Sequence, residues 1–255
     1  MSSRRQVLKQ LVAMGALAGL SALPRAQAAT PEAKARAVGR YHMPDEAGPQ
    51  ARVWVAFGAS RDIWGRDYQE VQATIGRLVQ AMAPHTEVNV LCREEEEALA
   101  RKLCGEQNTR FIVAKLDDIW LRDTGGVFVQ NGEGELGLVD FNFNGWGDKQ
   151  EHEQDGGVAE WVSTQADAHY LQSRLTGEGG GIEVDGKGTA IMTESCWLNG
   201  NRNPGLTKAQ VEAELKANLG LRKIIWLPGI KGRDITDAHV DFYARFVRPG
   251  VVVIN

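Results

Sequence analysis

Cysteine, long apolar runs and an excess of basic charge are all lacking in this 255-residue chain. Its three cysteines, an odd number, exclude a fold built on a set of disulfides. The 29 basic residues are outnumbered by 33 acids, which makes the chain a poor candidate for nucleic-acid binding, since that needs a concentrated basic face. Only residues 11–23 form an extended apolar run, shorter than the about 20 residues of a membrane-spanning helix. We therefore expect neither a nucleic-acid partner nor stable membrane insertion.

The N-terminal segment has the features of an export signal. Arg4 and Arg5 precede the apolar run, and an Ala-Gln-Ala sequence after it provides a cleavage site. Paired arginines here indicate the twin-arginine route, with the export machinery as a partner and a periplasmic or secreted product. The alternatives are an ordinary secretory signal or a retained anchor. We predict a signal peptide over residues 1–28, a poorly ordered linker over 29–41 and one folded domain over 42–255.

The rest of the chain alternates strand-like and helix-like segments. Apolar residues make up 43% and charged residues 24%, which is ordinary for a globular protein. The predicted strands are 52–58, 87–92, 110–116 and a buried strand at 223–228, and the predicted helices are 68–83, 93–104 and 207–219. Thr207 can cap the last helix and Gly220 can close it. The pattern predicts an α/β fold.

A strand, turn and strand pattern recurs after three polar positions. Asp123 precedes the pattern at 126–141, and Glu178 precedes the one at 179–194. His239 precedes the third, at 241–255, whose first residue is Asp241. Each repeat has a glycine-bearing turn, which is typical of a β-hairpin. If the hairpins are arranged around an axis, the side chains at their leading ends converge on one pocket.

Asp123, His239 and Asp241 are the residues best suited to chemistry. Two carboxylates facing each other across a pocket can hold a planar guanidinium through its fixed N–H donors, and a histidine beside them can move protons near neutral pH. Each also has an ordinary structural interpretation. Asp123 could form a surface ion pair with Arg122, Asp241 could cap a strand, and His239 could be a half-buried strand histidine bonded to a carbonyl.

Five motifs resemble those of agmatine deiminases and their bacterial peptidylarginine deiminase relatives, in the same order. They are WLRDTG at 120–125, FNGWG at 143–147, EGGGIEVDGKGT at 178–189, NGNRNP at 199–204 and TDAHVDFYARFV at 236–247. The resemblance runs from about Met43 to the last residue. It implies a fivefold pseudo-symmetric α/β propeller of the pentein type, with the site in its central channel.

The same resemblance implies a hydrolase that converts agmatine and water to N-carbamoylputrescine and ammonia through a covalent amidino-cysteine intermediate. Asp123 and Asp241 match the carboxylates that hold the guanidinium, His239 matches the general acid/base, and Glu178 matches a pocket carboxylate. Trp120 could stack on the guanidinium or fill core. The substrate is then a small cationic guanidine, agmatine or arginine, and no cofactor or metal is implied.

The nucleophile of that family is a cysteine in a glycine-rich segment near the C-terminus, and no such segment occurs before Asn255. The final apolar run after a turn signal is typical of a strand that has just begun. We therefore expect a chain truncated before its last blade, with about four of five blades present.

None of the three cysteines matches that nucleophile. Cys92, Cys104 and Cys196 are interpreted as buried structural thiols, although Cys92 and Cys104 could pair with each other. Cys196 follows the Glu178 loop in the chain and stays open as a substitute nucleophile.

Other functions remain alternatives. Without a nucleophile, the chain would be a non-catalytic exported guanidinium-binding protein, and an exported enzyme could instead act on peptidyl arginine to make citrulline. A metal hydrolase is disfavoured because the other four histidines lack ligand spacing. The glycines at 179–181 lack the lysine of a phosphate-binding loop. Asp117, Asp118, Asp234 and Asp237 are expected to cap and solvate loops, with Asp118 also able to line the pocket.

Overall fold

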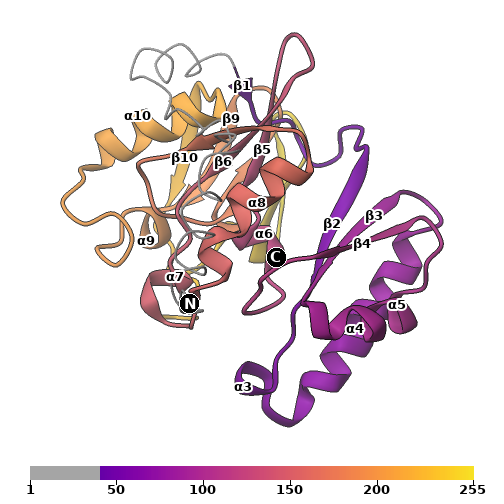
Figure 1. Cartoon of the computed structure of the whole chain (residues 1–255). Coiled ribbons are helices and arrows are strands. Elements are labelled where there is room, and N and C mark those ends of the chain that lie inside the picture. Colours follow the sequence, from indigo (N-terminus) through magenta and orange to yellow (C-terminus); the bar gives the residue numbers. More distant parts are fainter. Residues whose placement is uncertain (1–40) are drawn as a thin grey trace, which may run out of the picture. The chain divides into compact units, whose positions relative to one another are not determined.

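The computed structural model describes residues 41–255. The predicted signal peptide at 1–28 and all but the last residue of the predicted linker at 29–41 lie outside the described residues. The described residues form helices and four separate sheets, without a closed barrel, so the α/β class is confirmed (Figure 1). No helix within residues 41–255 is both long and apolar enough to cross a bilayer.

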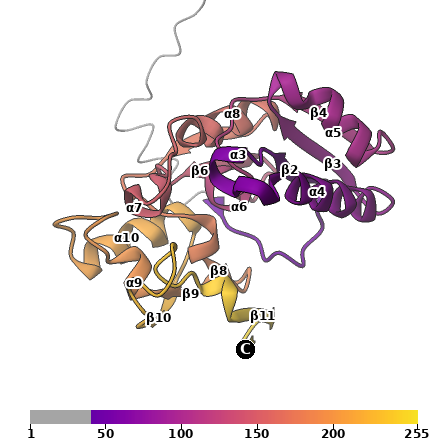
Figure 2. The ribbon, with the colours of Figure 1, turned by 90° about the horizontal axis from the view of Figure 1, so that it is seen from below.

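The first sheet is parallel, in the order β2-β3-β4. Its elements are β2 (Arg52–Phe57), α3 (Arg61–Trp64), η1 (Gly65–Asp67), α4 (Tyr68–Met82), β3 (Glu87–Cys92), η2 (Glu94–Glu96), α5 (Glu97–Cys104) and β4 (Thr109–Val113). The helices α4 and α5 pack together on one face of this sheet (Figures 1 and 2), where Phe57, Val79 and Val90 are fully buried. The predicted strands and helices of this segment are confirmed within a few residues.

The second sheet has the order β1-β5-β6-β7. Its elements are β1 (Tyr41–His42), α6 (Leu121–Thr124), β5 (Val127–Asn131), β6 (Leu136–Asp140), α7 (Gly145–Asp148), η3 (Asp155–Gly157), α8 (Val158–Gln165) and β7 (His169–Gln172). Strands β5 and β6 form the predicted antiparallel hairpin. The sheet shares a core with the third sheet, in which Val129, Val139 and Trp197 are fully buried.

The third sheet has the order β10-β9-β8. Its elements are η4 (Gly179–Gly181), β8 (Glu183–Val184), β9 (Thr189–Thr193), α9 (Glu194–Trp197), α10 (Lys208–Leu219) and β10 (Lys223–Leu227). Strands β8 and β9 form the second predicted hairpin. Asp185 braces its turn by accepting bonds from the backbone N–H groups of Lys187 and Thr189. The prediction of a buried strand at 223–228 is wrong in burial, because β10 is an edge strand with only Ile224 buried.

The last sheet is the third predicted hairpin. It follows η5 (Val240–Phe242) and consists of β11 (Ala244–Arg248) and β12 (Val251–Ile254), paired antiparallel. Val247, Val253 and Ile254 are exposed on it. Asp123, Glu178 and His239 therefore each lie just ahead of a hairpin, as the repeated sequence pattern predicts.

Helix α10 begins with a capping box, and its contribution to stability can be measured. The Thr207 hydroxyl accepts a bond from the backbone N–H of Gln210, whose side chain accepts one from the backbone N–H of Thr207. Thr207→Ala removes the first bond and is expected to lower the free energy of unfolding by about 1 kcal/mol, measured by urea denaturation. Thr164→Ala, at an exposed position inside α8, is the matched control and should change it by less than about 0.5 kcal/mol. Equal losses in both would contradict the role of the cap.

Candidate active site

The glycine at 180 shows where the predicted site residues meet. A Cβ atom built on Gly180 would lie 2.5 Å from His239 Nδ1, 2.9 Å from Asp123 Oδ1 and 2.9 Å from Asp241 Oδ2. No side chain larger than hydrogen fits there without moving one of the three. Asp123 of α6 and the pair His239 and Asp241, from one segment far along the chain, therefore converge on Gly180.

Asp123 is held through both of its carboxylate oxygens. Its Oδ1 accepts a 2.8 Å bond from the backbone N–H of Gly180, and its Oδ2 accepts a 3.0 Å bond from Trp146 Nε1. Trp146 reaches this position because its backbone is left-handed, with φ of 57°, in a loop that Asn144 closes by accepting a bond from Gly147 N. Burial raises the pKa of Asp123 despite the nearby positive charge of His239.

His239 is 2% exposed and lies between two acids. Its Nε2 is 3.1 Å from Glu178 Oε2, and its Nδ1 is 3.7 Å from Asp123 Oδ2. Burial lowers the pKa of His239, but hydrogen bonds with Cys196 and Glu178 and the charge of Asp123 outweigh it and raise the pKa well above the usual range. The interpretation of His239 as a half-buried strand histidine bonded to a carbonyl is wrong.

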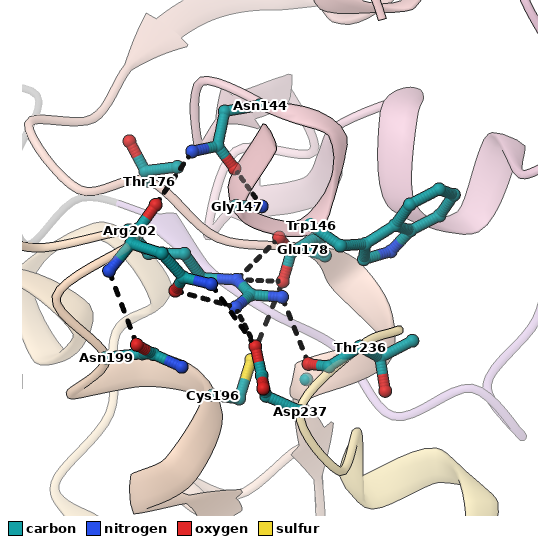
Figure 3. A network of polar contacts seen from close by, with 12 residues as sticks. Asn144, Trp146, Gly147, Thr176, Glu178, Cys196, Asn199, Arg202, Thr236 and Asp237 are labelled. Atoms are coloured by element: carbon teal, nitrogen blue, oxygen red, sulfur yellow. Dashed lines mark hydrogen bonds and ion pairs between the residues drawn. The ribbon is translucent and has the colours of Figure 1, made fainter. Parts of the chain in front are cut away.

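Glu178 is completely buried and is held by an arginine (Figure 3). Arg202 Nε donates to both Glu178 oxygens, at 2.8 and 3.0 Å. Burial raises the pKa of Glu178, but the hydrogen bond with His239 and the charge of Arg202 outweigh it and lower the pKa overall. Removing one partner of such a buried pair typically costs about 3–5 kcal/mol, because the other charge is left without compensation.

The same arginine ties a third segment to the site. Arg202 Nη1 donates to Asp237 Oδ2 at 2.9 Å, and Nη2 donates to the backbone oxygen of Thr236 at 3.0 Å. Lys149 Nζ also lies 2.7 Å from Asp237 Oδ2. Although burial opposes it, hydrogen bonds from Lys149 and Arg202 lower the pKa of Asp237 to about 2. The segment that leads into His239 is thus fixed by ionic contacts.

Asp241 is held by a second ionic network, which does not include Arg202. Arg122 Nε lies 3.0 Å from Asp241 Oδ2, and Arg122 Nη1 donates to Glu46 at 2.5 Å. Glu46 in turn pairs with Arg245 of β11. The expected alternative of an ion pair between Arg122 and Asp123 is wrong, because the ion-pair partners of Arg122 are Asp241 and Glu46. This second network keeps one oxygen of Asp241 engaged.

Asp123, His239 and Asp241 line a cavity of about 590 Å³ that has an aromatic wall, whereas the buried Glu178 is not among its lining residues. Trp120 is 43% exposed and stacks on Trp64 with a centroid distance of 6.1 Å, so it lines the cavity and does not fill core. Asp118 also lines the cavity and accepts bonds from Trp64 Nε1 and Gln150 Nε2. Three acids, one arginine and one histidine are the ionisable lining groups, and this excess of acids suits a cationic ligand. The lining residues are Ile63, Trp64, Asp118, Trp120, Arg122, Asp123, Trp146, Gln150, Ile235, Thr236, His239, Asp241 and Phe242.

All three cysteines are buried and unpaired, so the interpretation as buried thiols is confirmed and the possible bond between Cys92 and Cys104 is not formed. Cys92, at the end of β3, and Cys104, at the end of α5, lie in the core between α4, α5 and the first sheet, where burial raises the pKa of each to about 11. Cys196 contacts the site through Glu178, with its Sγ 3.5 Å from Glu178 Oε2. Burial and the neighbouring Glu178 raise its pKa, so Cys196 lacks the thiolate character of a substitute nucleophile.

Glu178, Cys196 and His239 also place one possible ligand atom each within 4.8 Å of one another. That donor set is one that zinc accepts. However, Arg202 donates to both oxygens of Glu178, so a positive charge already occupies the side of the carboxylate that a metal would need. The geometry disfavours a metal at this position.

The sequence did not reveal the roles of several residues of this site, among them Arg202 and Asp237. Arg202 lies within a quoted motif but carried no assigned role, and Asp237 was expected to solvate a loop, whereas it is 1% exposed and paired with Arg202 and Lys149. The expected capping role of Asp234 is confirmed, since it accepts bonds from the backbone N–H groups of Thr236 and Ala238. In the sequence, only the NRNP motif at 201–204 pointed to Arg202, and only the position of Asp237 two residues before His239 pointed to Asp237.

The chain is similar to proteins of one known family. The family described as Porphyromonas-type peptidyl-arginine deiminase matches residues 42–255. The agmatine deiminase of Pseudomonas putida is 38% identical over 225 residues, which cover 84% of this chain and 60% of that protein. The chain thus spans about 60% of the length of the curated relatives that it matches.

Solved structures agree with the sequence comparison. An agmatine deiminase of Enterococcus faecalis has a TM-score of 0.80 and 31% identity, with 89% of this chain and 62% of that chain covered. A cysteine-to-serine variant of a C. jejuni agmatine deiminase with substrate bound has a TM-score of 0.75 and 27% identity, with 83% and 63% covered. The described residues therefore have the α/β fold of these enzymes.

The close approach at Gly180 yields a test of the site. Gly180→Ala must displace His239 or one of the two carboxylates, and such overpacking typically costs about 1–3 kcal/mol. We expect the free energy of unfolding to fall by about that amount in urea denaturation, because at least one of the three packed side chains must move. Gly200→Ala is the matched control, since nothing lies within 4 Å of its added Cβ. An unchanged free energy of unfolding in Gly180→Ala would refute the close packing of the three residues around Gly180.

Proposed function

The chain belongs to the Porphyromonas-type peptidyl-arginine deiminase family, and from that premise we propose that the whole protein is an agmatine deiminase-type hydrolase. It would convert agmatine and water to N-carbamoylputrescine and ammonia. The observation that carries the proposal is the convergence of Asp123, His239 and Asp241 around Gly180 in an aromatic-walled cavity. The agmatine deiminases among its relatives support it.

The finer architecture is part of the same proposal. A fivefold propeller of the pentein type is supported by the separate sheets of the described residues and by the hairpins that follow Asp123, Glu178 and His239. Placing one polar group at the leading end of each hairpin brings these groups to a common centre. Residues 42–255 would then form one catalytic domain.

The guanidinium of the substrate is the group that the two carboxylates hold. Asp123 and Asp241 each place an oxygen 2.9 Å from the position of a Cβ atom on Gly180, and a guanidinium offers planar N–H donors to both. Trp120 and Trp64 provide ring faces along the cavity for the cation. Because the excess of acids over arginine in the lining offers little to a substrate carboxylate, agmatine is favoured over free arginine.

His239 would move the protons of the reaction. A thiolate forms a bond to the guanidinium carbon, the C–N bond to the departing nitrogen breaks, and His239 protonates the ammonia that leaves. His239 then takes a proton from the water that hydrolyses the amidino-cysteine. The burial of Cys92, Cys104 and Cys196 assigns the thiolate to none of them. This chain itself is therefore proposed to bind the guanidinium and to supply the acid/base.

The second candidate is a protein that binds guanidinium without turnover, and the burial of all three thiols favours it for this chain. Its pocket would be the same. A peptidylarginine deiminase that makes citrulline is the third candidate, and the name of the family is its support. Release of ammonia separates the second candidate from the first, and a comparison of agmatine with peptidyl arginine separates the third.

Substitution of one clamp residue tests the binding step. Asp123→Asn keeps the shape of the side chain but removes its charge, and a hydrogen bond to a charged group is worth about 1.5–3 kcal/mol. We expect agmatine to bind about ten- to a hundredfold more weakly in calorimetry. Asp148→Asn, whose side chain is 82% exposed, is the matched control and should leave binding unchanged. If agmatine binds equally well to both variants, Asp123 is not part of the clamp.

Export is proposed for the same protein. The paired arginines at Arg4 and Arg5, the apolar run and the small-residue cleavage site support delivery to the periplasm through the twin-arginine route. Replacing both arginines by lysine should leave uncleaved precursor in the cytoplasm, measured by cell fractionation and immunoblotting in a Gram-negative host. Lys9→Arg, outside the pair, is the control and should be exported normally. Normal export of the double variant would rule out this route.

A further inference from the structure

A row of alternating charges leads from the protein surface to His239. Lys149, with 31% of its side chain exposed, pairs with Asp237, and Asp237 pairs with Arg202. Arg202 pairs with Glu178, and Glu178 lies 3.1 Å from His239 Nε2. The Arg202 and Glu178 side chains are both 0% exposed. Each buried charge in the row is thus compensated by a neighbour of opposite sign.

The proton shared between Glu178 and His239 Nε2 can lie on either residue. In one form Glu178 is a carboxylate and His239 an imidazolium, and in the other Glu178 is a carboxylic acid and His239 a neutral imidazole. The two forms have the same number of protons and the same total charge. In an environment shielded from water the neutral form is favoured, because it places no separated charges in a low dielectric.

Arg202 contacts only one member of this pair. Its Nε donates to both Glu178 oxygens, at 2.8 and 3.0 Å, so a proton on either oxygen would compete with that donor and face a positive charge. Arg202 therefore stabilises the Glu178 carboxylate more strongly than it repels the His239 imidazolium, with which it shares no hydrogen bond. Arg202 cannot lose its own proton, which makes its influence constant over the working pH range.

We propose that Arg202 is a positioning residue that keeps the shared proton on His239 rather than on Glu178. The proposal rests on the proposed function in one respect, since an imidazolium is the form that can protonate departing ammonia. The same guanidinium donates to the backbone oxygen of Thr236 and to Asp237, so it also fixes the segment that presents His239.

The other titratable groups around His239 do not replace this role. Asp123, from α6, lies on the Nδ1 side and favours a charged ring, but it does not contact Glu178. Cys196, from α9, contributes to the raised pKa of His239 through a hydrogen bond, but its own pKa is raised and it is not a fixed charge. Asp234 acts on His239 only through its charge and is engaged with Thr236. Among the described residues with a printed contact to Glu178, Arg202 alone is a fixed positive charge.

The position of the proton can be observed directly by nitrogen-15 NMR of histidine-labelled chain. The His239 signals are identified by their loss in His239→Gln. In the wild-type chain at pH 7 we expect both ring nitrogens to carry protons, consistent with the raised pKa of His239. In Arg202→Gln we expect loss of this doubly protonated signature and the appearance of an unprotonated ring nitrogen.

Lys149→Gln is the matched control. This substitution removes a positive charge from the same row of residues. Because Lys149 contacts Asp237 and not Glu178, the His239 signature should not change. Arg202→Lys disturbs the fold less, because it keeps a positive charge next to Glu178. Unlike arginine, the lysine can lose its proton, so its charge is not constant with pH. In that variant the imidazolium should persist at pH 7 and be lost at a lower pH than in the wild-type chain.

Three results would overturn the inference. They are a neutral His239 ring in the wild-type chain, an unchanged signature in Arg202→Gln, or the same loss in Lys149→Gln. If Arg202→Gln does not fold, by circular dichroism, the comparison of the wild-type chain with Arg202→Lys decides, and loss of the imidazolium at the same pH in both contradicts the role. None of these readouts uses turnover. A shifted signature in a chain that does not bind agmatine would contradict the proposed function and leave the inference standing.

Discussion

The ion pair between Arg202 and Glu178 is the interaction on which the site depends. Both side chains are fully buried, and together they connect the loop before α10, the segment before η4 and the segment that carries His239. A buried ion pair contributes little net stability compared with apolar packing, but breaking it leaves a charge without a partner. Its effect here is to allow one arrangement of three loops, since any other would separate buried opposite charges.

The folded elements were predictable because their signals are local. The three hairpins could be read from alternating apolar residues around glycine turns, and α10 from Thr207 and Gly220. Asp123, His239 and Asp241 were found because each starts such a hairpin and lies in a recognisable motif. The exposure of β10 was missed, because an edge strand and a central strand have similar apolar runs, and only the sheet order distinguishes them.

The roles of Arg202, Asp237 and Gly180 could not be read in the same way. Arg202 meets Glu178 across 24 residues of sequence and Asp237 across 35, and no local pattern indicates either pairing. Gly180 resembles its neighbours in a glycine run, yet a Cβ atom on it would lie within 2.9 Å of His239, Asp123 and Asp241. The position of Cys196 beneath Glu178 is a similar case, since burial of a thiol depends on what the rest of the chain places above it.

The long sequence separations within the site also determine when it can form. Strands of each hairpin pair with partners close by in the chain, whereas Gly180 meets Asp123 across 57 residues and His239 meets Glu178 across 61. Closing such loops costs entropy that only the final contacts repay, so distant pairings form later than local ones. The hairpins can therefore fold while Glu178 and Arg202 are still hydrated, and desolvation of this pair belongs to the last stage of folding. The charged centre of the site would then be complete only once the sheets around it are in place.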